Sequence, residues 1–155
     1  MLVMLLLGGK LADGFRGVPY GPAEILTEAP GEGCKENPGP GTRWECPVKL
    51  GDASAMAYYM VEEGLFYGVV LESTGATNAS ALHGVLTAAY GGCRKLHDYD
   101  TATLADCAWT DGSVAAIWEY NQFSGKAQVL LFDQTLQAKI KAAAAARAAE
   151  AAKGL

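Results

Sequence analysis

Residues 64–92 read GLFYGVVLESTGATNASALHGVLTAAYGG, and the spacing of the apolar residues changes within this stretch. Residues 65–72 are a run of apolar, β-branched and aromatic residues, which is typical of a strand with at least one buried face. Residues 78–90 instead carry large apolar side chains at steps of three and four, which is typical of one face of a helix. Gly91 and Gly92 are expected to end this helix, because glycine accepts the left-handed conformation found there. The stretch therefore predicts a strand that leads into a helix.

Three polar residues, one just before this helix and two in its first half, have roles that follow from their positions. Thr77 and Asn78 are candidate N-caps, because each offers a side-chain oxygen to the free N–H groups of the first turn. Asn78 also begins an Asn-Ala-Ser glycosylation sequon, although a cap explains the same residue. His83 lies off the apolar face of the helix, so we expect its side chain to be exposed to solvent.

The residues before the quoted stretch predict two further strands, at 43–50 and 55–61. Only a tight connection fits at residues 62–64, so the second of these strands and strand 65–72 should pair as an antiparallel hairpin. Both alternating faces of residues 55–61 carry apolar or aromatic side chains. This pattern indicates a sheet that is partly buried on both sides.

The order of elements is expected to occur twice. The first half holds a short helix that begins at Pro22 and buries Ile25 and Leu26, then a loop with Cys34 and Cys46, then the strands above. The second half holds the quoted helix, a loop from Cys93 to Cys107, a hairpin turn at Asp111 and Gly112, and strands at 113–120 and 127–132. A last helix follows, which Asp133 caps and which runs to about residue 153. The sequence therefore predicts an α+β fold in which antiparallel β-meanders form one sheet with the helices on one face, as a tandem αβββ repeat with an added C-terminal helix.

Composition divides the chain into three regions. Residues 1–13 begin with an apolar segment, residues 14–133 are expected to form one α+β domain of two repeats (14–72 and 73–133), and residues 134–155 form an Ala-rich helix. Alanine is the best helix former, but an isolated helix of this length is marginal without packing. Beyond residue 142 two alternatives stay open: a solvated tail of low complexity, or a helix that packs against a partner.

The N-terminal apolar segment, residues 1–7, is too short to span a bilayer, which requires about 20 apolar residues. It has no basic flank and no clear cleavage site of small residues. It is either the remnant of a secretory signal or a buried first strand. Any association with a membrane is expected through this segment alone.

The charge of the chain is unevenly placed. The 155 residues carry a net charge of −5. Residues 134–155 hold four basic residues against the single acid Glu150, a net of +3, which leaves −8 for the first 133 residues. An acidic body without a basic patch is a poor partner for nucleic acid, because binding to phosphates depends on Lys and Arg.

The four cysteines allow three pairings. Pairing of nearest neighbours, Cys34 with Cys46 and Cys93 with Cys107, suits the repeat and closes loops of 11 and 13 intervening residues. Four free thiols in a reducing compartment are the alternative. A zinc site is disfavoured, because the sequence has no C-x-x-C or C-x-x-H spacing.

No motif for catalysis is found in the sequence, which contains neither G-x-S-x-G nor H-E-x-x-H. The neighbouring residues Glu62 and Glu63 point to opposite sides of a strand or turn and cannot share a substrate. His97, with Asp98 and Asp100, could hold a metal weakly, although the polarity of a loop explains the same residues. The chain is therefore expected to be no enzyme and to carry no cofactor or metal.

Aromatic residues concentrate on the predicted sheet. Most of their area is expected in the core, and an exposed share would form a contact surface. The residues assigned to this surface are Tyr59 and Tyr67 on the strands and His97 and Tyr99 in the second cysteine loop.

Three short motifs carry a resemblance to known proteins: GFRGVPYG at 14–21, LTAAYG at 86–91, and Trp109 before a V-x-x-x-W-x-Y strand. In these motifs the chain resembles small secreted or periplasmic bacterial domains, several of which are lipoproteins. The order of meander and helix is also similar to that of β-lactamase inhibitor proteins and of the small lipoprotein of the outer-membrane assembly machine. The resemblance covers about residues 14–137 and implies an extracytoplasmic protein. Lipid anchoring is not implied, because no lipobox cysteine follows the apolar start, and no binding residue is carried over.

Two functions are expected on these grounds. The first is a non-catalytic, extracytoplasmic protein that acts by contact with another protein or as a subunit of an assembly. The alternative is a secreted inhibitor or a small-ligand binding module that uses the sheet face or the Cys93–Cys107 loop.

Overall fold

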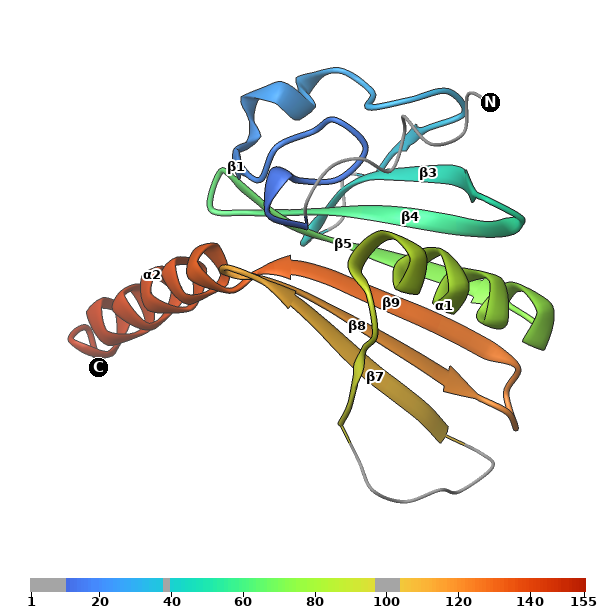
Figure 1. Ribbon diagram of the computed structural model, residues 1–155. Coiled ribbons are helices and arrows are strands. Elements are labelled where there is room, and N and C mark those ends of the chain that lie inside the picture. The colour runs from blue at the N-terminus through green and yellow to red at the C-terminus, as the bar shows by residue number, and fades with distance from the viewer. Residues whose placement is uncertain (1–10, 38–39, 97–103) are drawn as a thin grey trace.

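The computed structural model describes residues 11–37, 40–96 and 104–155, with residues 104 and 105 described by their backbone alone. Its centre is one antiparallel sheet of nine strands (Figure 1). Two α-helices and two short 3-10 helices complete the described fold. The predicted α+β class with antiparallel meanders is confirmed.

Two three-stranded meanders make up most of the sheet. The first consists of β3 (Thr42–Leu50), β4 (Ala53–Glu62) and β5 (Leu65–Thr74), and the second of β7 (Leu104–Asp111), β8 (Val114–Asn121) and β9 (Lys126–Asp133). Their third strands, β5 and β9, pair antiparallel at the centre of the sheet. The two halves of the chain are therefore joined through this pair, with the same strand order on either side of it.

A two-residue strand and a disulfide lie at the outer side of each meander. The strand β2 (Lys35–Glu36) pairs with β3, and β6 (Arg94–Lys95) pairs with β7. Cys34, directly before β2, is bonded to Cys46 in β3, and Cys93, one residue before β6, is bonded to Cys107 in β7. The expected pairing of nearest neighbours is confirmed. It ties each edge strand to the first long strand of its meander.

An α-helix follows each meander, α1 (Ala76–Tyr90) after β5 and α2 (Gln134–Ala152) after β9. The cap predicted for α1 is wrong, because Gly75 and not Thr77 or Asn78 is its N-cap residue. The chain leaves β5 with a φ of 95° at Gly75, a conformation that glycine adopts without strain.

Asn78 has a different role, in the first turn of α1. Its side-chain oxygen accepts a hydrogen bond from the N–H of Ser54 at 3.1 Å, and its amide group donates to the carbonyl of Thr74 at 3.0 Å. Asn78 therefore ties α1 to the start of β4 and the end of β5.

The hydrophobic core lies between one face of the sheet and a layer formed by α1 and the N-terminal segment. In that segment, η1 (Leu11–Asp13) contacts β7 and β8, and η2 (Ala23–Thr27) contacts β5, close to where β1 (Gly21–Pro22) pairs with that strand. The layer buries these residues against the sheet: Leu11, Phe15, Val18, Leu26, Ala79, Leu82 and Leu86. Ile25 was expected to be buried but is 51 % exposed, because η2 is a short 3-10 segment, interrupted by non-helical backbone angles at Leu26, in which Leu26 alone is buried.

The three tryptophans anchor this layer through their indole N–H groups. Trp44 donates to the carbonyl of Leu26 at 2.7 Å, and Trp109 donates to the carbonyl of Gly91 at 2.7 Å. Trp118 donates to the carbonyl of Ala79 in α1 at 3.1 Å. Each bond satisfies a polar group in the core and fixes the covering segment to a strand.

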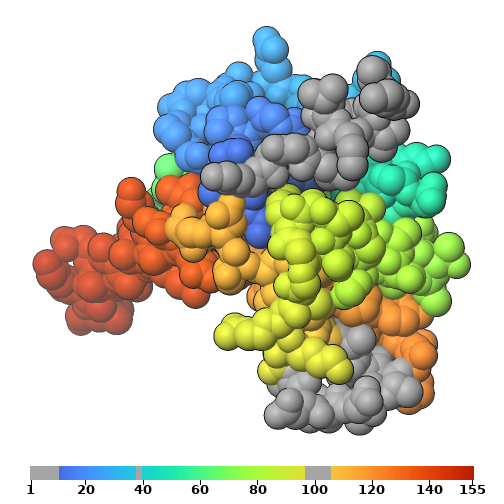
Figure 2. Space-filling view, in the orientation of Figure 1, coloured from blue at the N-terminus to red at the C-terminus, as the bar shows by residue number. Residues whose placement is uncertain are grey.

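The helix α2 is capped as predicted, since the side chain of Asp133 accepts a hydrogen bond from the N–H of Leu136 at 3.0 Å. Ile140 is its only buried residue, and it lies outside the core cluster that α1 shares. Figure 2 shows the C-terminal half of α2 protruding from the body. Beyond residue 143 every residue of the chain is exposed.

The strand β7 was missed, because the loop that begins at Cys93 was expected to run as far as Cys107 and only Asp111-Gly112 gave a hairpin signal. The segment 1–7, interpreted as a signal remnant or a strand, lies outside the described residues.

Candidate functional site

The second face of the sheet, opposite the core, carries a row of apolar side chains that crosses the sheet. The strand register places these residues side by side: Tyr58 opposite Val70, Val70 opposite Leu130, Leu130 opposite Ile117, and Ile117 opposite Ala108. Glu45 lies at the β3 end of this row, opposite Tyr58. Apart from the buried Ala108, the members of the row are half-buried. Half-buried apolar neighbours on adjacent strands form a continuous surface.

Two further rows flank the apolar row. One consists of Met60, Gly68, Phe132, Ala115 and Thr110. The other consists of Met56, Glu72, Gln128, Glu119 and Asp106, and so brings three carboxylates to this face. We call the three rows together the open face.

Acidic groups surround the aromatic end of the open face. Tyr58 has its pKa raised, first by loss of solvation and then by the nearby carboxylates of Glu72 and Glu45. Tyr67 also has a raised pKa, from burial and from the carboxylate of Glu62, and its hydroxyl contacts the sulfur of Met60 at 3.7 Å. Both phenols therefore stay protonated at neutral pH and present neutral hydroxyls beside carboxylates.

A shallow depression of about 340 Å³ lies at one edge of the open face. Its lining includes Met56, Glu72 and Gln128 of the acidic row, together with Lys126 at the start of β9. The depression is large enough for one side chain of a partner, and its lining, with one acidic and one basic residue, favours a polar group.

The helix α2 begins at the end of the central strand β9 and contacts β5 and β9. Arg147, in the protruding half of α2, forms an ion pair with Glu63 at the tip of the β4–β5 hairpin. Both side chains are partly exposed, so this pair stabilises the orientation of α2 only modestly.

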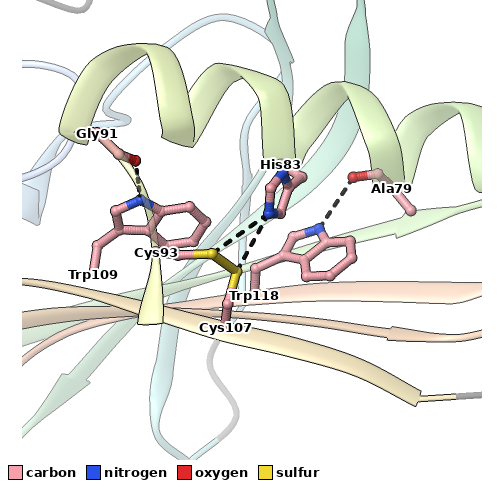
Figure 3. The surroundings of a disulfide bond; sticks show 7 residues. All are labelled: Ala79, His83, Gly91, Cys93, Cys107, Trp109 and Trp118. Atoms are coloured by element: carbon pink, nitrogen blue, oxygen red, sulfur yellow. Dashed lines mark hydrogen bonds between the residues drawn. A yellow bond between two sulfur atoms is a disulfide. The ribbon is translucent and has the colours of Figure 1, made fainter. Parts of the chain in front are cut away.

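A second cluster lies on the core side, where α1 crosses the Cys93–Cys107 disulfide. The Nε2 atom of His83 is 3.6 Å from Sγ of Cys93 and 3.3 Å from Sγ of Cys107. Figure 3 shows His83 reaching from α1 toward the two sulfur atoms, with Trp109 on one side and Trp118 on the other. The imidazole centroid is 5.7 Å from that of Trp109 and 4.8 Å from that of Trp118.

The surroundings of this cluster are apolar but not closed. Cys107 is 3 % exposed, whereas His83 and Cys93 are half-buried. Both indole N–H groups are bonded to backbone carbonyls, so the tryptophans offer only ring carbons to the histidine. The cluster therefore places an imidazole beside two sulfur atoms, which would be N and S donors of the kind that zinc and copper prefer if the disulfide were opened to two thiolates.

The expectation that His83 is exposed is wrong. It points from the side of α1 toward β7 and β8, where the disulfide and the two tryptophans leave room for a ring. The cluster has no spacing signature, because His83 lies ten residues before Cys93 and on a separate element. In the sequence, Trp109 stands two residues after Cys107, and this is a local signal that places a tryptophan near the cluster.

The structure tests two of the four residues that were assigned to a contact surface. Tyr59 is 2 % exposed and is not on a surface, because the pleat of β4 turns it to the core face, where it stacks on Phe66. Tyr67 lies half-buried beside Met60. His97 and Tyr99 lie outside the described residues.

No protein-family model, curated protein or solved structure matches the chain. Within the described residues, none of the helices is both long and apolar enough to cross a membrane. Two disulfides are typical of proteins that fold in an oxidising compartment.

Proposed function

We propose that this chain is a non-catalytic, extracytoplasmic protein that acts as a subunit of an assembly, and that its partner is a second copy of itself. The observation that carries the proposal is the combination of a protruding helix, α2, with an open apolar sheet face on the same chain. The two disulfides support the extracytoplasmic location.

The length of α2 favours a packing partner. It has 19 residues, of which Ile140 alone is buried. An isolated helix of this size is marginally stable in water even when rich in alanine. Small alanine side chains also allow another surface to approach the helix backbone closely.

Charge complementarity favours the open face as the surface that receives α2. Residues 134–155 carry a net charge of +3, and the first 133 residues carry −8. Glu72, Glu119 and Asp106 line one row of the open face, beside its apolar row. Reciprocal docking of α2 on the open face of a second copy would form a closed, two-fold symmetric dimer.

The experiment is sedimentation velocity of the full chain over a range of concentrations, compared with two variants. Deletion of residues 142–155 removes the protruding half of α2, and Ile117→Glu places a charge in the apolar row. Both variants should stay monomeric at concentrations where the full chain associates. Phe123→Glu is the matched control, because Phe123 is 86 % exposed in the β8–β9 turn, away from the face.

A full chain that is monomeric at every concentration would overturn the proposal and would favour an inhibitor that acts as a monomer. Association that survives both variants would place the interface elsewhere. Far-UV circular dichroism and intact mass, with and without reductant, establish that the variants keep the sheet and both disulfides.

A further inference from the structure

The cluster of His83, Cys93 and Cys107 is not used by the proposed assembly, because it lies between α1 and the core face of the sheet. Each of its three residues offers one ligand atom, and these atoms lie within 4.8 Å of one another. We propose that the three residues form a zinc site when a dithiol reductant opens the Cys93–Cys107 disulfide.

The position of the imidazole is the first argument. Zinc binds sulfur at about 2.3 Å and nitrogen at about 2.0 Å, so neighbouring nitrogen and sulfur ligands of a tetrahedral site are about 3.5 Å apart. Nε2 of His83 lies 3.3 and 3.6 Å from the two sulfur atoms. The histidine therefore already holds a ligand distance to both sulfurs, and only the sulfurs must separate, to about 3.8 Å, once the bond between them is broken.

Charge is the second argument. Two thiolates and a neutral imidazole balance the charge of Zn²⁺, so the loaded site is neutral. Apolar surroundings favour a neutral complex, because an uncompensated charge there has a large free-energy cost of desolvation. The rings of Trp109 and Trp118 supply such surroundings, and their N–H groups are bonded elsewhere.

Access is the third argument. Cys93 and His83 are half-buried, so a reductant can reach the outer sulfur and a metal ion can enter from the same side. The three protein ligands leave the fourth position of a tetrahedral site to water, as in zinc sites that remain open.

The reaction balances in two steps. The dithiol transfers two electrons and two protons to the disulfide, so that the S–S bond breaks, two cysteine thiols form and the reductant becomes a disulfide. Zinc then replaces the two thiol protons, which are released to solvent, and the imidazole binds through the lone pair of Nε2.

The second disulfide supplies an internal control. The Cys34–Cys46 pair closes a loop of similar size but has no histidine beside it among the described residues. Removal of this pair by Cys34→Ala with Cys46→Ala should leave the zinc site intact. Removal of the other pair by Cys93→Ala with Cys107→Ala should abolish it.

The experiment titrates zinc chloride into the full chain, reduced by a phosphine so that no competing thiol is added, against a chromophoric chelator. The reduced chain and its Cys34→Ala, Cys46→Ala variant should each bind one zinc ion. The oxidised chain and the Cys93→Ala, Cys107→Ala variant should bind none. His83→Gln should weaken binding at least about tenfold, since loss of even a supporting residue of a metal site has that effect. Cobalt in place of zinc should give sulfur-to-metal charge-transfer absorption in the same variants.

Absence of zinc binding in the reduced chain would overturn the proposal, as would equal affinity in the His83→Gln variant. If reduction unfolds the chain, zinc should restore the folded circular dichroism spectrum of the Cys34→Ala, Cys46→Ala variant and not that of the same variant with His83→Gln. Failure to restore it would also overturn the proposal.

Discussion

Tyr58 and Tyr59 are adjacent residues of β4 with opposite environments. Tyr59 faces the core, where its ring stacks on Phe66 at 5.7 Å and meets Phe15 edge to face at 5.7 Å. Burial raises the pKa of Tyr59 to about 12, with a smaller opposing effect from the charge of Arg16. Tyr58 faces the open side, half-buried beside carboxylates. Because successive side chains of a strand point to opposite faces of the sheet, a step of one residue separates a buried phenol from one on the open face.

The buried Tyr59 makes stability depend on pH in alkaline solution. In the unfolded chain a tyrosine ionises near pH 10, whereas Tyr59 in the folded chain keeps its proton until about pH 12. Between these values the unfolded state binds fewer protons, so the free energy of unfolding falls as the pH rises, and the contribution is complete below about pH 10. Denaturant titrations across this range should show a shallower fall for Tyr59→Phe than for the native chain. Equal slopes would contradict the prediction.

The indole bonds of Trp44 and Trp109 lead to a matched pair of mutants. Replacing either residue by Phe removes a 2.7 Å hydrogen bond and leaves the carbonyl of Leu26 or Gly91 without its donor. We expect Trp44→Phe to lower the free energy of unfolding by about 1–3 kcal/mol and Trp109→Phe by about 0.5–1.5 kcal/mol, because Gly91 is exposed and water can reach its carbonyl. Chemical denaturation measures this loss, and Phe123→Ala at the exposed turn should change stability by less than about 0.5 kcal/mol. No loss in both tryptophan variants would show that these bonds are not structural.

For single residues, the sequence predicted which side chains share a face of a strand or helix but not what surrounds that face. Alternation along β4 correctly separated Met56, Tyr58 and Met60 from the opposite set, yet it did not tell which set faced the core. Tyr59 was therefore assigned to the surface. His83 was misassigned for a related reason. Its neighbours come from a loop and two strands later in the chain, and the periodicity of a helix gives no information about such contacts.

The elements were easier to predict than the residues around them. The helix α2 has a cap residue, a run of the best helix former and no interruption, so its start at Gln134 was predicted to the residue. The strand β7 was not predicted, because its first half lies between the two cysteines and was assigned to their loop, although the hairpin that joins it to β8 is local. Pro22 predicted the start of a short helix, but it did not predict that this helix would have the 3-10 form.

The cap of α2 allows a test at the level of the element. Asp133 accepts hydrogen bonds from the N–H of Leu136 and from the hydroxyl of Ser113 at 3.2 Å. Asp133→Ala should lower the free energy of unfolding by about 1 kcal/mol and reduce the helical signal in circular dichroism. Asp133→Asn should recover most of the loss, because asparagine is an equally good cap. Similar losses in both variants would assign the effect to charge rather than to capping.

The whole molecule is organised by the β5–β9 pair, which joins two meanders of the same strand order. The sequence predicted two meanders and two disulfides, because hairpin turns and cysteine spacing are local signals, but it located only the second and third strands of the second meander. It did not predict that the third strands of the two meanders would pair, since that contact joins segments far apart in the chain. The division of the chain into regions 1–13, 14–133 and 134–155 remains a prediction. The open face, too, emerged only from the register across five strand pairs.

The proposed self-association has an electrostatic signature that belongs to the whole molecule. A C-terminal segment of charge +3 is attracted to a body of charge −8. Salt screens this attraction, with a screening length of about 10 Å at 0.1 M ionic strength. We expect the dimer to weaken several-fold as salt is raised, and the loss to appear mainly as slower association. Sedimentation and stopped-flow mixing at low and high salt would measure both.

Lys139 and Lys141 provide the matched test, because both are exposed on the first half of α2. Their replacement by Glu should abolish association at low salt while leaving α2 helical, since Glu and Lys have similar helix propensities. The same reversal at Lys35 and Lys95, which lie in the edge strands β2 and β6 away from α2, should have little effect. If added salt strengthened the dimer instead, the apolar row alone would hold the two copies together, and the acidic row would have no part in choosing the partner.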